Sequence, residues 1–106
     1  MTTLRTWSGS SQFKYEGTVE KGTDIWPGQA KYPINVSGAD YGKLLSNFKR
    51  REVAVGPHRV NPPADSLGEW LQANVSQTAI ASYVAPILVK EQHAVRVKDT
   101  TKLKFK

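Results

Sequence analysis

The spacing of apolar residues changes several times along the chain, and each change marks an expected element. In residues 12–20 apolar side chains occupy every second position, which is the period of a half-buried strand. A second strand is expected in residues 31–36, where Pro33 favours an edge or a bulge because proline donates no ladder hydrogen bond. Turns are expected over residues 21–24 and 26–29, the second because Pro27 and Gly28 occupy the central positions of a type II turn. Residues 1–11 are rich in serine and threonine and are expected to be loose, with an edge strand that contains Leu4 and Trp7 as the alternative.

The first helix is expected to begin at Ser37, whose hydroxyl can accept a hydrogen bond from a free backbone N–H, with Asp40 near the positive end of the helix. The basic run of residues 49–51 suits the negative C-terminal end. A short strand at residues 52–55 follows. The apolar stripe of this helix consists of Tyr41, Leu44, Leu45 and Phe48.

Two more helices are expected beyond a proline-rich connector. Ser66 and Glu69 have capping-box spacing, which marks the start of the first. In the second, apolar residues recur at i, i+3, i+4, i+7 and i+8, the spacing of a buried stripe. Pro86 lies inside this stripe, so either one helix kinks there, which the uninterrupted stripe favours, or a new helix begins near Pro86. The stripe consists of Ile80, Tyr83, Val84, Ile87 and Leu88.

From Ala94 onward the period changes to two, which predicts a two-stranded ribbon with a turn at residues 99–101. We expect Val95, Val97, Leu103 and Phe105 to face the core. Arg96, Lys98, Lys102 and Lys104 would then share the solvent face. Such a ribbon can contact phosphate, or it can be an amphipathic hairpin whose lysines protect an exposed edge from aggregation.

In this order, the helices, turn and ribbon of residues 65–105 resemble a winged helix-turn-helix. The resemblance implies that residues 78–93 are the recognition helix and residues 95–105 the wing. The solvent side of that helix is expected to offer mainly small residues, namely Gln77, Thr78, Ala81, Ser82 and Ala85, followed by Lys90 and Gln92.

The expected fold class is α+β, with a small antiparallel sheet and one helix followed by the winged-helix-like helix-turn-helix and β-ribbon. Its 106 residues suit one domain, with a seam at residues 56–64 between an N-terminal α+β part and the winged-helix-like part. At this length we expect the two parts to share one core.

The distribution of charge along the chain indicates the kind of partner to expect. The net charge is +6, and residues 49–106 carry ten basic and five acidic groups, whereas residues 1–48 are nearly neutral. A one-sided basic surface attracts polyanions, and a solvated lysine-rich tail would have the same composition. The absence of cysteine excludes disulfides and favours a reducing compartment. No signal-like or membrane-spanning apolar run is present, so we expect a cytoplasmic protein with no membrane contact.

Catalytic and metal-binding patterns are sparse. His58 and His93 lie far apart, and neither has an acidic residue at helical metal-ligand spacing. No zinc-protease, nucleophile-elbow or P-loop motif occurs. We therefore expect no enzyme activity and no cofactor, with a small hydrolase or nuclease built around His58 and Arg59 as a weaker alternative.

The favoured function is non-catalytic binding of nucleic acid, DNA in preference, through the basic ribbon and the helix-turn-helix. The alternative is a protein–protein interaction module that uses a degenerate winged helix. Residues expected at a nucleic-acid interface are Arg96, Lys98, Lys102 and Lys104 of the ribbon, Lys49, Arg50 and Arg51 at a helix end, and Gln77, Thr78 and Ser82 of the helix-turn-helix.

Overall fold

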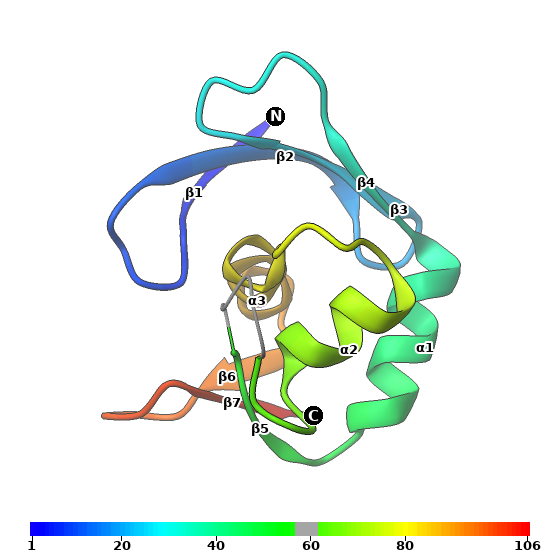
Figure 1. Ribbon diagram of the computed structural model, residues 1–106, viewed down its shortest axis with the longest axis vertical. Coiled ribbons are helices and arrows are strands. Elements are labelled where there is room, and N and C mark those ends of the chain that lie inside the picture. Colours follow the sequence, from blue (N-terminus) through cyan, green and yellow to red (C-terminus); the bar gives the residue numbers. More distant parts are fainter. Residues whose placement is uncertain (57–61) are drawn as a thin grey trace.

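The computed structural model describes residues 1–56 and 62–106, which form two antiparallel sheets and three helices. The predicted α+β class is confirmed. Helix α3 (Ala81–Lys90) lies in the middle, with the four-stranded sheet arched over one side and the three-stranded sheet on the opposite side (Figure 1). Helices α1 (Gly38–Phe48) and α2 (Leu67–Asn74) close a third side.

The four-stranded sheet is a meander of β1 (Thr2–Arg5), β2 (Gln12–Thr18), β3 (Gly22–Pro27) and β4 (Ile34–Ser37), in that order. Leu4 belongs to an edge strand, as in the alternative for residues 1–11, and Pro33 directly precedes the other edge strand. The turn predicted over residues 21–24 is wrong, because β3 already begins at Gly22. The next turn lies one residue later than predicted, since the Ala30 N–H bonds to the carbonyl of Pro27 at 2.9 Å.

Both predicted serine caps are present. The Ser37 hydroxyl accepts from the Asp40 N–H at 3.0 Å and starts α1 (Gly38–Phe48). The Ser66 hydroxyl accepts from the Glu69 N–H at 3.1 Å and starts α2 (Leu67–Asn74). The Glu69 carboxylate reaches back to the N–H of Asp65 at 3.0 Å, so two free donors are satisfied at that helix end.

Helix α3 continues without a break through Pro86, so the alternative of two separate helices is wrong. It is shorter than predicted, because Ile80 is its N-cap residue and the segment with Gln77 and Thr78 precedes it. Nearly all of its surface is covered. Ala81 and Ala85, which were expected to face solvent, are 1% and 0% exposed. These small side chains let neighbouring elements approach α3 closely, which is the reason for their burial.

The three-stranded sheet has the order β5 (Glu52–Ala54), β7 (Lys102–Phe105), β6 (Ala94–Arg96). The predicted ribbon is therefore the β6–β7 pair, and β5 adds a third strand beside β7. Both sheets contribute to the same apolar cluster as the three helices. Its fully buried large side chains are Tyr41, Phe13, Phe48, Phe105, Ile25, Leu44, Leu67, Leu71, Ile80, Ile87, Leu88 and Leu103.

Glu91, the C-cap residue of α3, holds the four-stranded sheet against the helix. Its carboxylate accepts hydrogen bonds from the Tyr15 hydroxyl and from the Val19 N–H, both at 2.9 Å. On the same side, the ring of Tyr83 packs edge-on against Phe13 at 5.3 Å between centroids. Hydrogen bonds to a charged acceptor are stronger than neutral ones, so this carboxylate fixes the position of β2 relative to α3.

The position of Leu88 predicts a large cost of truncation. Leu88→Ala should lower the free energy of unfolding by about 2–5 kcal/mol, because the side chain is fully buried and leaves a cavity. Urea denaturation measures this loss. Lys43→Ala, at an exposed position of α1, is the matched control and should change stability by less than about 0.5 kcal/mol. Equal, small effects of the two substitutions would mean that Leu88 and α3 are not part of the core.

Two buried tyrosines predict a loss of stability at alkaline pH. Burial raises the pKa of Tyr41 to about 12, and burial together with the Glu91 hydrogen bond raises the pKa of Tyr15 further. In the unfolded chain the pKa of tyrosine is about 10. The folded state therefore holds more protons above that pH, and the free energy of unfolding should fall as pH rises from about 10 to 12.

The check is urea denaturation at a series of pH values for the parent protein and for Tyr41→Phe. The variant lacks one of the two raised pKa values, so its stability should decline less steeply over the same range. Identical slopes for the two proteins would contradict the assignment.

Candidate functional site

The outward face of the three-stranded sheet is set by the central strand β7. Leu103 and Phe105 point inward and are 0% and 1% exposed, so Lys102 and Lys104 point outward. The ladder continues beyond the strand, because the Lys106 N–H donates to the carbonyl of His93 at 3.2 Å. By the same alternation, the outward positions of β7 and its extension are all lysines.

Strand β6 has the opposite phase from the one predicted. Ala94 pairs with Phe105 and is 1% exposed, so Ala94 takes the inward position. Val95 therefore lies outward beside Lys104 and is 46% exposed, whereas Arg96 pairs with Leu103 on the inner side. The expectation that Arg96 shares a face with Lys102 and Lys104 is wrong. The physical reason is that the small Ala94, and not Val95, fits against the core at this position.

Arg96 instead joins β6 to the segment that follows β1. Its guanidinium lies over the Trp7 ring, 3.8 Å from the centroid, and donates a hydrogen bond to the Trp7 carbonyl. Trp7 is 8% exposed, and its backbone N–H donates to the carbonyl of Ser82 in α3 at 2.9 Å. The indole is thus held between a helix and a cation, and the Arg96–Trp7 contact bridges the two sheets.

The basic run at the end of α1 adjoins the lysines of β7. The Lys104 ammonium donates to the carbonyl of Arg50 at 3.0 Å, and the N–H of Phe105 donates to the carbonyl of Arg51 at 2.9 Å. The guanidinium of Arg51 lies over the ring of Phe48, 5.4 Å from its centroid. We define the basic face as the exposed cations that this arrangement joins, namely Lys49, Arg50, Lys102, Lys104 and Lys106. Arg51 instead lines a hollow with Asp65 and Glu69, and Lys98 lies in the turn beyond β6.

Little negative charge interrupts this face. Within strands β5, β6 and β7 the acidic residue is Glu52, and its carboxylate lies 3.9 Å from the ammonium of Lys102. Both side chains are about half exposed, at 48% and 50%. An exposed pair of this kind contributes only about 0–1 kcal/mol, so Lys102 remains free to exchange Glu52 for another anion.

The helix-turn-helix residues expected at the interface lie elsewhere. Gln77 and Thr78 line a shallow hollow with Pro27 and Ile34 of the four-stranded sheet. Ser82 is half-buried. The structure therefore places Lys102 and Lys104 on one face of β7, beside the segment with Lys49 and Arg50, and leaves Arg51, Lys98 and the helix-turn-helix residues apart from them.

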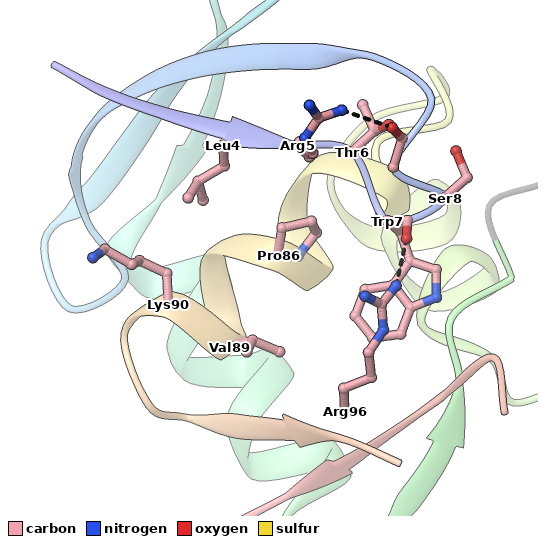
Figure 2. A pocket seen from close by; sticks show the side chains of 10 residues that line it. Leu4, Arg5, Thr6, Trp7, Ser8, Pro86, Val89, Lys90 and Arg96 are labelled. Atoms are coloured by element: carbon pink, nitrogen blue, oxygen red, sulfur yellow. Dashed lines mark hydrogen bonds between the residues drawn. The ribbon is translucent and has the colours of Figure 1, made fainter. Parts of the chain in front are cut away.

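A second feature is a groove that the sequence does not indicate. It has a volume of about 400 Å³ and lies where β1, α3 and β6 meet (Figure 2). The residues that line it come from three distant segments, so no local pattern announces them. They are Leu4, Arg5, Thr6, Trp7, Ser8, Gly9, Pro86, Val89, Lys90 and Arg96, and we call this space the β1–α3 groove.

Within residues 1–56 and 62–106, no three histidine or acidic side chains gather in a way that could hold a metal ion. Over the same residues, no helix is long and apolar enough to cross a bilayer. His58 and Arg59, which carry the hydrolase alternative, lie outside the described residues.

The Arg96–Trp7 contact predicts a measurable contribution to stability. Arg96→Met keeps an apolar stem but removes the charge and the N–H donors, and should lower the free energy of unfolding by about 1–2 kcal/mol. The indole of Trp7 should become more exposed and shift the fluorescence emission to longer wavelength. Lys98→Met, at an exposed position of the same hairpin, is the control. Indistinguishable effects of the two substitutions would contradict the bridging role.

Comparison of the chain with protein-family models, curated proteins and solved structures gave no match. The two features of this chain that suit ligand binding are the basic face and the β1–α3 groove.

Proposed function

We propose that this protein binds nucleic acid through the basic face, by contacts to phosphate and without base readout. The observation that supports this best is the hydrogen bond from Lys104 to the Arg50 carbonyl, which places the lysine row of β7 next to the basic segment that follows α1. Scattered cations would give only a weak, diffuse field. A continuous group on a rigid sheet can neutralise several phosphates at once and release their counterions.

The spacing on β7 suits a repeating anion. A strand rises about 3.3–3.4 Å per residue, so outward lysines two positions apart lie about 7 Å from one another. Three such lysines, at positions 102, 104 and 106, form a row in which each can meet a separate phosphate. Long, flexible ammonium side chains position a protein on a phosphate backbone but distinguish bases poorly.

Helix α3 has no part in this proposal. Its surface is covered by the two sheets and α2, so it offers no broad side chain face to a groove. Sequence preference should therefore be small, and DNA and RNA should both bind through their shared phosphates.

A protein partner is the second candidate, and Val95 favours it. This apolar side chain is 46% exposed on the same face as Lys104. An acidic partner with an apolar centre would cover both residues. It would bury Val95, whereas phosphate contacts would leave that side chain in water.

Salt dependence tests the nucleic-acid proposal. Binding of labelled duplex DNA, single-stranded DNA and RNA is followed by fluorescence anisotropy at several salt concentrations. The logarithm of affinity should fall with the logarithm of salt, by a slope of roughly 0.9 per phosphate neutralised on duplex DNA. Replacing Lys102, Lys104 and Lys106 together by Ala should flatten that slope by about two to three units.

The control replaces Lys14, Lys21 and Lys43 by Ala, which removes the same charge from exposed positions away from the basic face. Its slope should stay close to that of the parent protein. Equal effects of the two triple variants would show that net charge, and not this surface, controls binding. No binding of any nucleic acid at tens of micromolar protein and low salt would overturn the proposal and leave the protein partner.

A further inference from the structure

The β1–α3 groove combines an apolar floor with a cationic rim. Leu4 of β1 and Pro86 and Val89 of α3 face the open space from two sides (Figure 2). The compact ring of Pro86 leaves room that a long side chain at this position would fill. The volume of about 400 Å³ lies within the range of about 300–1,000 Å³ that small-molecule sites commonly have.

Two cations flank this floor, Lys90 from the last turn of α3 and Arg96 from β6. Arg5 also lines the groove, but it pairs with the exposed Gln12, whereas Leu4 pairs with the buried Phe13, so the Arg5 guanidinium lies on the other side of β1 from the floor (Figure 2). No acidic residue is among those that line the groove. The acid next in sequence, Glu91, has its carboxylate bonded to Tyr15 and Val19 on another side of α3. The groove therefore carries positive charge that no lining carboxylate offsets.

Arg96 is held in place before any ligand arrives, because its guanidinium is stacked on the Trp7 ring and bonded to the Trp7 carbonyl. A guanidinium has five N–H donors, so Arg96 retains donors beyond the one used here. Fixed donors lose little entropy when they bind an anion, which favours affinity. Lys90 is exposed and can turn toward the same space.

From this combination we infer that the β1–α3 groove binds a small organic anion with an apolar body. The apolar body lies on Leu4, Pro86 and Val89, and the anionic group pairs with the rim cations Lys90 and Arg96. Neither part suffices alone: a bare inorganic anion leaves the floor in contact with water, and a neutral apolar molecule leaves the cations without a partner. This inference does not rest on nucleic-acid binding, which uses the opposite side of the three-stranded sheet.

Octanoate is a suitable probe because it joins a flexible apolar chain to one carboxylate. Titrating it into ¹⁵N-labelled protein should shift amide resonances of residues 4–9, 87–90 and 96 in a saturable manner. An alkyl acid of this size is expected to have a Kd on the order of 1 mM. Octan-1-ol lacks the carboxylate and inorganic phosphate lacks the apolar chain. Each should therefore bind at least about fivefold more weakly than octanoate.

Lys90→Gln keeps the fold, since this side chain is exposed, and should weaken octanoate about fivefold. Lys43→Gln, an equal loss of charge from α1, should leave the affinity unchanged. Val89→Phe should abolish binding by filling the groove without altering charge. The variant with Ala at positions 102, 104 and 106 should bind octanoate like the parent protein, which separates this site from the basic face.

Three results would overturn the inference. The first is the absence of saturable shifts with octanoate at concentrations well above the expected Kd. The second is a set of shifts that maps to the basic face instead of the groove. The third is equal affinity for octanoate and octan-1-ol, or equal losses from Lys90→Gln and Lys43→Gln, because either would mean that the cations of the rim do not recognise the anion.

Discussion

The burial of α3 is the constraint on which the rest of the structure depends. A ten-residue helix with apolar or small side chains on almost every side must be covered all round, because water would otherwise meet its apolar surface. One sheet covers one side, the second sheet covers the opposite side, and α2 closes part of the remainder. Neither sheet could lie where it does without α3 between them, since the helix is the surface against which both inner faces pack.

Polar contacts then determine the positions of the two sheets relative to α3. Glu91 bonds the end of α3 to β2, Trp7 bonds the loop after β1 to α3, and Arg96 bonds that loop to β6. Each of these contacts joins a different pair of elements, so together they determine the relative placement of the two sheets. The contact of Arg96 with Trp7 also holds one cation of the β1–α3 groove in position. The position of Arg96 in the groove therefore follows from the contacts that join the two sheets and α3.

Much of the fold could be predicted because its signals are local. Ser37 and Ser66 lie three residues from the N–H groups they cap, and the stripe of α3 repeats within one helix. The phase of β6 could not be read in this way, because Ala94 and Val95 are both apolar and only the shape of the core decides between them. Arg96 and Trp7 are 89 positions apart, so no pattern along the chain indicates their contact or the groove beside it. The cations of residues 49–51 and of β7 were predicted individually, whereas their junction through the Arg50 carbonyl depends on tertiary structure.

The place of α3 late in the chain has a consequence for synthesis on the ribosome. The four strands that α3 will support occupy residues 2–37, so they leave the ribosome well before residues 81–90. At about 5–20 residues per second, the inner side chains of those strands, such as Phe13 and Tyr15, wait for several seconds without their partner. During this interval the nascent sheet exposes an apolar surface to other proteins in the cell. Chaperones that shield such surfaces should therefore associate with the nascent chain until the third helix has emerged.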